Sequence, residues 1–347
     1  MTRLARLAPG AGAALLAGVL TSFLCAKVQA APMNITLGTL APDGTSYHRM
    51  LLEMREKWRK APGGGVNLRI YAGGKMGGEA KMVSQMRLGA LDSAMLTATG
   101  LAEIEPAVTG LQSIPMMFRS LEEVDFIGAK LQPMLAKRME KAGFVVLFWG
   151  DLGWVRFFSK QPMLTPDDLR KVKMFAWAGD AAYVELWKSG GFQPVPLETA
   201  DIVPMLDTGL INCVPMPPIV ALAAQVHDRA PHMLELNWAP LTGGLVVRKQ
   251  VWDKVAAEAR ESLLKAADEA GKLNKAQGRA ESDKAVAAMK AKGLTVHPVS
   301  PELDAAWRKT AEVFYPKLRG GLVPADIFDE VVRLLKEYRA SGSSAKP

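Results

Sequence analysis

The sequence predicts an α/β protein of two lobes, with mixed, mostly parallel sheets and a long helix that bridges the lobes. Strand-like and helix-like runs alternate through residues 35–96, and the same alternation returns after residue 143. A strand–helix–strand order makes neighbouring strands parallel and places the helices on the faces of the sheet. Residues 249–289 are rich in Ala, Glu, Lys and Leu and contain no Pro, which predicts a helix long enough to reach both lobes.

The elements of the first half follow from local patterns. Strands are expected at 35–38, 66–71 and 94–96, and a helix near 79–88. Thr45 or Ser46 can cap an earlier helix, because apolar residues then recur at helical spacing. These residues are Tyr47, Met50, Leu51, Met54 and Trp58. The loops that follow the strands are therefore available for a ligand.

The second half repeats the rhythm. The continuous apolar run 143–149 predicts a strand buried on both faces. Further strands are expected at 172–177, 193–197 and 210–214, and helices at 165–169, 181–189 and 201–206. Within the long helix, Gly271 and Gly278 are the positions where it would bend.

The first thirty residues are typical of a secretory signal peptide. Arg3 and Arg6 precede an apolar run at 13–24, and small residues precede a cut after Ala30. The apolar run is short for a membrane span, which needs about 18 residues or more. We therefore expect export to the periplasm with residues 1–30 removed. Cys213 is then the only cysteine, so no intramolecular disulfide can form.

Charge and motifs argue against several classes of function. The net charge is +8, but the basic residues are scattered and form no stripe with interleaved aromatics, so no nucleic-acid partner is expected. No Gly-x-Ser-x-Gly motif occurs, and the four histidines lie in no recognisable catalytic setting. His227 and His232 are five residues apart and interrupted by Pro231, which disfavours a metal site. We expect neither an enzyme nor a bound metal or cofactor.

Arg156 lies in an aromatic stretch of the second half. Trp154 and Phe157 flank it, and Phe175 and Trp177 follow on the next predicted strand. A guanidinium among aromatic faces can hold a carboxylate by a bidentate bond while the rings bury the rest of the ligand. The alternative is a surface arginine beside ordinary core aromatics.

Several runs together carry a family resemblance. They are 74–79, 114–118 with Ser120 and Glu122, 153–160, 165–169 with Pro162, and 206–212. In order and spacing they resemble the solute receptors of tripartite ATP-independent periplasmic (TRAP) transporters, in the dicarboxylate-receptor-like family. The resemblance implies a periplasmic-binding-protein-like fold that closes around a small organic ligand and hands it to the membrane subunits of the transporter.

The resemblance also implies domain boundaries. The first lobe would comprise 31–153 plus 242–283, and the second 154–241 plus 284–340. Apart from the resemblance, the small and polar residues at the end of the chain predict a disordered tail at 341–347.

The family's binding residues are only partly present. Arg156 matches one arginine of the pattern, but the main carboxylate-clamping arginine would fall at Phe175, and an asparagine that often touches ligand would fall at Met216. The expected ligand-binding residues are Arg156, Trp154, Phe157, Phe175, Trp177, Met216 and Asn212, with Thr39, Leu40, Glu79 and Phe118 as weaker candidates from the first lobe.

These losses favour a different ligand. A charge-assisted hydrogen bond contributes about 1.5–3 kcal/mol to the free energy of binding, and burial of a carboxylate without a partner costs several kcal/mol. Apolar burial gains about 25 cal/mol per Å² instead. We therefore predict a ligand larger and more hydrophobic than a dicarboxylate, with at most one acid group, held by Arg156.

Two alternatives stay open. Arg119 or Lys75 could replace the missing arginine, and an ordinary organic acid would then bind. The protein could instead be a periplasmic lipid or hydrophobe carrier that works with another membrane assembly on the same fold.

Overall fold

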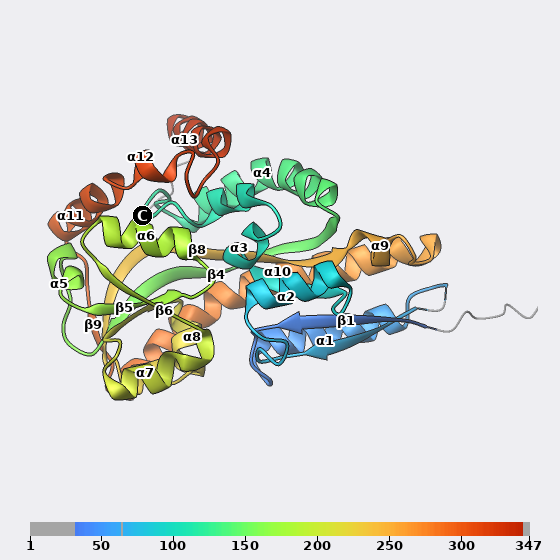
Figure 1. The fold of residues 1–347 in the computed structure, drawn as a ribbon, viewed down its shortest axis with the longest axis horizontal. Helices are drawn as coiled ribbons and strands as arrows, with labels where there is room; N and C mark the ends of the chain where they lie inside the picture. The colour runs from blue at the N-terminus through green and yellow to red at the C-terminus, as the bar shows by residue number, and fades with distance from the viewer. Residues whose placement is uncertain (1–31, 64, 343–347) are drawn as a thin grey trace, which may run out of the picture.

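The computed structural model describes residues 32–63 and 65–342 (Figure 1). The predicted signal peptide at 1–30 and most of the predicted tail at 341–347 lie outside the described residues. None of the helices in the described ranges is long and apolar enough to span a membrane.

The strands form one mixed sheet that runs through both lobes. They are β1 (Met33–Thr39), β2 (Val66–Tyr71), β3 (Ser93–Thr97), β4 (Phe144–Ser159), β5 (Lys173–Trp177), β6 (Gln193–Leu197), β7 (Cys213–Met216), β8 (His232–Arg248) and β9 (Thr295–His297). Their order is β2-β1-β3-β8-β4-β7-β5-β6, with β9 paired to β8. Five pairs are parallel: β1 with β2 and β3, β5 with β6 and β7, and β8 with β9. The pairs β3–β8, β4–β7 and β4–β8 are antiparallel. The predicted two-lobed α/β fold with a mixed sheet is confirmed.

The long strands β4 and β8 join the lobes. They pair with each other from Phe144 opposite Arg248 to Ser159 opposite His232. The register shifts between Asp151 and Trp154, next to the lobe boundaries predicted at 153/154 and 241/242. These boundaries stay a prediction.

Helices cover both lobes. The first lobe and the central region carry α1 (Ser46–Arg59), α2 (Glu79–Leu88), α3 (Ala98–Ala102) and α4 (Leu121–Lys141). The second carries α5 (Pro166–Arg170), α6 (Ala181–Ser189), α7 (Ile202–Thr208) and α8 (Pro218–Ala223). The C-terminal part forms α9 (Lys249–Trp252), α10 (Ala257–Lys290), α11 (Pro301–Glu312), α12 (Tyr315–Leu318) and α13 (Ala325–Ala340). In Figure 1, α10 passes from the region of α1 to the region of α7 and α8.

The helix α10 confirms the predicted bridge but begins later than expected. The prediction of a continuous helix from Lys249 is wrong, because the chain breaks after α9 and restarts at Ala257. The carbonyl groups of Asp253 and Val255 accept hydrogen bonds from Arg260. Trp252 and Val255 are both buried at this break.

The two glycines of α10 allow close packing. A Cβ atom on Gly271 would lie 2.7 Å from the Cβ of Phe148, and one on Gly278 would lie 3.0 Å from the carbonyl oxygen of Asp151. Both neighbours belong to β4, and α10 continues through both positions. The glycines therefore bring α10 against the strand that joins the lobes, and the expected bends at these positions stay a prediction.

Local signals explain several other elements. Thr45 caps α1 by accepting a hydrogen bond from the backbone N–H of His48, and Thr165 and Asp168 form a capping box on α5. The strand β6 contains Pro194 and Pro196, and it lies at the edge of the sheet, where a missing N–H is tolerated. The strand predicted at 210–214 begins instead at Cys213, because Asn212 and Ile211 bond to the preceding segments.

The C-terminal helices contact both lobes. Arg339 of α13 forms an ion pair with Glu123 of α4 at 2.7 Å, whereas Trp307 of α11 donates a hydrogen bond to the carbonyl of Leu164, next to α5. The assignment of residues 284–340 to the second lobe therefore stays a prediction.

We expect Gly271→Ala to lower the free energy of unfolding by about 1–2 kcal/mol. The gain in helix propensity of about 1 kcal/mol is smaller than the overpacking cost, because the Cβ of Phe148 is fixed to the backbone and cannot move aside. Urea denaturation measures the change. The exposed Glu261→Ala on the same helix serves as the control and should change stability by less than about 0.5 kcal/mol. An unchanged or more stable Gly271→Ala protein would contradict the packing role.

Candidate ligand-binding site

A cavity of about 470 Å³ lies between the two lobes. We call it the interlobe cavity. Its lining comes from the β1–α1 loop, the end of β3, the crossing of β4 and β8, and α8 of the second lobe. Apolar side chains dominate, among them Leu40, Met95, Phe148, Trp177, Ile219 and Leu241. The loops after β1 and β3 thus supply one wall, as expected for parallel strands that end at a ligand site.

Two further cavities adjoin it at Trp177. One, of about 610 Å³, lies along the glycine-rich loop before α2 and reaches Glu198 of the second lobe. The other, of about 70 Å³, lies against Phe175 and Trp187. Trp177 lines all three cavities.

Trp177 is held in place from two sides. It stands at the end of β5, where its ring meets Phe175 edge to face at 5.5 Å. Its indole Nε1 donates a hydrogen bond to Thr199 Oγ1 at 3.1 Å. Because both the ring and the N–H are engaged, Trp177 is a rigid wall between the cavities.

Glu79 lines the interlobe cavity, but its carboxylate is engaged within the protein. It accepts hydrogen bonds from the N–H and hydroxyl of Thr97, at 2.7 and 2.6 Å, and from the N–H of Gly100 at 3.0 Å. Burial raises the pKa of Glu79, and the hydrogen bonds from Thr97 and Gly100 oppose this rise. These bonds attach the start of α2 to the segment after β3.

Two hydroxyl groups of the lining residues have no partner. The hydroxyls of Tyr47 and Thr242 are buried and make no hydrogen bond to any described residue. Burial, with Glu281 and Asp151 as further causes, raises the pKa of Tyr47, so its phenol stays neutral. The helical pattern in the sequence predicted that Tyr47 faces the core, but it did not indicate that the hydroxyl group would line a cavity. A buried tyrosine hydroxyl normally has a hydrogen-bond partner.

Arg156 lines none of these three cavities. Its Nη1 forms an ion pair with Glu235 at 2.9 Å, and its Nη2 lies 3.5 Å from Asn237 Oδ1. Its Nε is buried without a partner. The guanidinium expected to be isolated is thus neutralised by a carboxylate of the neighbouring strand β8.

Some of the other predicted site residues line these cavities, and the rest lie in the core or outside the cavities. Thr39, Leu40, Glu79 and Trp177 line the interlobe cavity, and Phe175 lines the small cavity beside it. Phe157 packs between Trp238 and Trp307, and Phe118 is fully inside the core. Met216 is buried opposite Arg156 in the sheet, and Trp154 and Asn212 are half-buried outside the three cavities. Ligand contact by any of these residues stays a prediction.

No group of three or more His, Cys, Asp or Glu side chains within residues 32–63 and 65–342 is arranged to hold a metal ion. Cys213 is buried and unpaired, and burial raises the pKa of its thiol, which makes it a poor nucleophile.

The chain matches the family described as bacterial extracellular solute-binding protein, family 7, over residues 37–319. It belongs to this family. The match confirms the resemblance to TRAP periplasmic solute receptors. It also confirms that the protein is a binding protein and not an enzyme.

Relatives of known name share about a quarter of their residues with this receptor. The C4-dicarboxylate-binding periplasmic protein DctP of Rhodobacter capsulatus is 24% identical over 305 residues, which cover 86% of this chain and 90% of the relative. The 2,3-diketo-L-gulonate-binding periplasmic protein YiaO of Escherichia coli is 24% identical, with 77% and 81% covered.

Solved structures show the same fold. A TRAP periplasmic solute-binding protein from Ralstonia eutropha, with bound (S)-2-acetolactate, superposes with a TM-score of 0.81 at 21% identity. One from Sulfurospirillum deleyianum, with bound succinate, gives 0.79 at 19% identity. Each covers 88% of this receptor and 99% of the solved chain.

The lobes touch each other beside the cavities. A Cβ atom on Gly78, the N-cap of α2, would lie 2.5 Å from Glu198 Oε2 of the second lobe. A Cβ on Gly179 would similarly lie 3.7 Å from the Cβ of Ala80. Gly78 and Gly179 therefore mark two places where the lobes lie close to each other.

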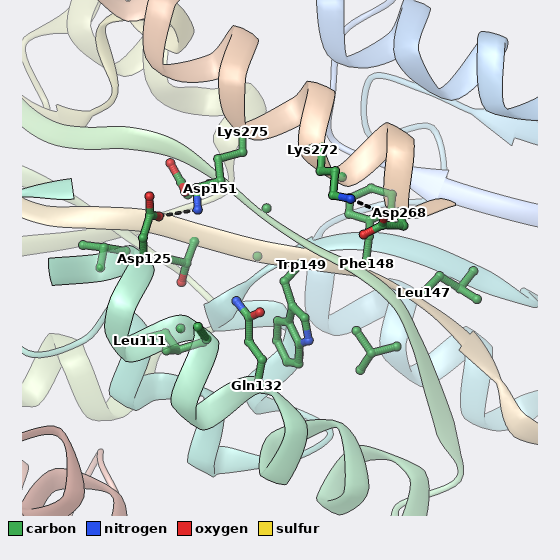
Figure 2. A pocket seen from close by; sticks show the side chains of 18 residues that line it. Leu111, Asp125, Gln132, Leu147, Phe148, Trp149, Asp151, Asp268, Lys272 and Lys275 are labelled. Atoms are coloured by element: carbon green, nitrogen blue, oxygen red, sulfur yellow. Dashed lines mark ion pairs between the residues drawn. The ribbon is translucent and has the colours of Figure 1, made fainter. Parts of the chain in front are cut away.

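A polar cavity of about 370 Å³ lies against β4, between α4 and α10 (Figure 2), and it shares Phe148, Gly150 and Asp151 of β4 with the interlobe cavity. Both lysines of its lining are paired with aspartates of the same lining: Lys275 with Asp125, and Lys272 with Asp268 at 2.7 Å. Because both lysines are already paired with carboxylates, neither is free to bind an acidic ligand.

Arg279 of α10 extends this network of ion pairs to Asp151 in the middle of β4. It donates to Asp125 at 2.7 and 3.0 Å and to Asp151 at 2.8 and 2.9 Å. Burial would raise the pKa of Asp125, but the hydrogen bonds from Arg279 and Lys275 outweigh it and lower the pKa. Arg279 thereby ties α4 and α10 to the strand that joins the lobes.

We expect Arg279→Ala to lower the free energy of unfolding by about 3 kcal/mol, because Asp151 is 5% exposed and would lose its cation. Chemical denaturation measures this. Arg333→Ala is the matched control, since Arg333 pairs with Glu330 and Glu337 on the exposed face of α13, and should cost less than about 1 kcal/mol. Equal losses in the two variants would contradict the bracing role of Arg279.

Proposed function

We propose that this receptor captures an apolar ligand, with at most one acid or other polar group, in the interlobe cavity and delivers it to the membrane subunits of a TRAP-type transporter. The observation that carries the proposal is the charge of the lining. Among the described residues that line the interlobe cavity, Arg49 is the only basic one, and its side chain is exposed and donates to the carbonyl of Gly44.

Magnitudes favour an apolar ligand. A dicarboxylate enclosed here would have two charges to desolvate, at a cost of several kcal/mol each without a cation beside them. An apolar ligand that buries about 200 Å² gains about 5 kcal/mol. Leu40, Phe148 and Trp177 supply apolar surface for that burial, and the cavity falls within the size range of sites for drug-sized ligands.

A small organic acid is the competing function. It is favoured by the relatives, whose names and structures include C4-dicarboxylate, succinate and 2,3-diketo-L-gulonate. It requires a cation, and the candidates are engaged or exposed: Arg156 pairs with Glu235, Lys75 with Asp43, and Arg119 is exposed. The lipid-carrier alternative would use the same cavity with another membrane assembly.

Export is part of the proposal. Membership of a periplasmic binding protein family supports a periplasmic location, and the sequence places the cut after Ala30. The mass of the intact protein isolated from periplasm would reveal the processed N-terminus.

We expect the receptor to bind at least one of three ten-carbon probes, decan-1-ol, decylamine or decanoate, at least tenfold more tightly than succinate. The physical reason is that chain burial outweighs a charge that finds no buried cation. Isothermal titration calorimetry measures the affinities, and mass spectrometry of a solvent extract identifies any co-purified ligand. Tight succinate binding that is lost in Arg156→Ala would contradict the proposal and support the small acid.

Gly78→Ala should change the affinity for the best ten-carbon probe by less than about threefold. The new Cβ would lie 2.5 Å from Glu198 Oε2, but this oxygen is the end of a flexible and exposed side chain, which can turn aside at little cost. Calorimetry with that probe measures the effect. The double variant Gly78→Ala/Glu198→Ala is the control and should bind like Glu198→Ala alone. A tenfold loss in Gly78→Ala that the double variant recovers would contradict this expectation and show that the contact limits closure of the lobes.

A further inference from the structure

The carboxylates around the interlobe cavity differ in how they are satisfied. The acidic residues of its lining are Glu79, Asp151 and Glu281. Glu79 accepts three hydrogen bonds from Thr97 and Gly100, and Asp151 is paired with Arg279. Both are therefore satisfied within the protein.

Glu281 of α10 is the exception. Its Oε2 accepts a hydrogen bond from the hydroxyl of Ser46 at 2.6 Å. Its Oε1 accepts none, and no basic group of the described residues lies within 4.0 Å of its carboxylate. Glu281 thus brings a negative charge to the cavity wall with hydrogen-bonding capacity to spare.

The neighbours of Glu281 do not supply a positive charge. Tyr47 lines the same cavity, is 7% exposed, and has a hydroxyl without a partner. Its pKa is raised by burial and by the charges of Glu281 and Asp151, which places the tyrosine in their negative field. Arg279, on the same helix as Glu281, spends its donors on Asp125 and Asp151.

We propose that Ser46, Tyr47 and Glu281 form a subsite for a hydrogen-bond donor on the ligand, an ammonium or hydroxyl group, and that this subsite disfavours a carboxylate. The inference rests on the proposed function, since it assumes an apolar ligand in the interlobe cavity and names its polar end. An ammonium group would satisfy Oε1 by a charge-assisted hydrogen bond, which is about twice as strong as a neutral one. A carboxylate at the same place would meet a like charge.

The test uses decylamine, decan-1-ol and decanoate, which share a ten-carbon chain and differ in the polar end. In calorimetric titrations at pH 7, we expect the order amine, alcohol, acid, with the amine at least tenfold tighter than the acid. In Glu281→Gln the amine should weaken at least tenfold, the alcohol by less than threefold, and the acid should strengthen. The ratio of amine to acid affinity is read within one variant, so partial loss of folded protein does not change it.

Asp283→Asn is the matched control, because Asp283 lies on the same helix, is exposed, and is outside the cavity lining. It removes the same charge and should leave all three affinities within about twofold, which excludes a general field effect. An acid-first order in the wild type, or an unchanged amine-to-acid ratio in Glu281→Gln, would overturn the inference while the proposed function stands. If none of the three probes binds, the proposed function fails and the inference fails with it.

Discussion

The antiparallel pairing of β4 and β8 is the constraint on which the rest of the structure depends. Both strands pass through both lobes, so the two halves share one sheet. The helix α10 lies against this pair because Gly271 and Gly278 leave room for the backbone of β4. Arg279 adds a charged brace to Asp151 at the crossing. The middle of this strand pair lines the interlobe cavity, with Phe148 and Leu152 on β4 and residues 241–244 on β8.

The side chains at and near the site suit ligand binding and not catalysis. The carboxylate of Glu79 is consumed by Thr97 and Gly100, and the thiol of Cys213 is buried. What remains at the cavity is a mostly apolar wall, interrupted by the carboxylate of Glu281 and by the hydroxyls of Tyr47 and Thr242. The two lobes meet beside it, where Gly78 lies against Glu198. Family membership and fold agree with a receptor that encloses a solute. A specific feature of this chain is that, among the described residues lining the interlobe cavity, the exposed Arg49 is the only basic one.

Local patterns in the sequence predicted most of the fold, because caps, glycine turns and apolar spacing act over a few residues. The spans of β2 and α2 agree with the structure. The break before α10 was missed, since it depends on burial of Trp252 and on Arg260, which are tertiary effects. The site was harder to predict from the sequence than the fold. Trp177, Thr39 and Leu40 line the cavity as expected. The ion pair of Arg156 with Glu235 was missed, because it joins residues 79 positions apart. Likewise Glu281 lies 235 residues from Ser46, its hydrogen-bond partner, and no local signal marks it.

The central claim is that most of the ligand affinity comes from burial of apolar surface, and that pairing of charge at the polar end of the ligand is the smaller contribution. Such burial produces a negative change in heat capacity on binding, whereas pairing of exposed charges weakens with salt. The most direct measurement is calorimetry of the co-purified or best ten-carbon ligand at several temperatures and two salt concentrations. The account predicts a clearly negative heat-capacity change and an affinity that varies less than about threefold between 50 mM and 500 mM salt. A heat-capacity change near zero, with an affinity that falls steeply with salt, would contradict it.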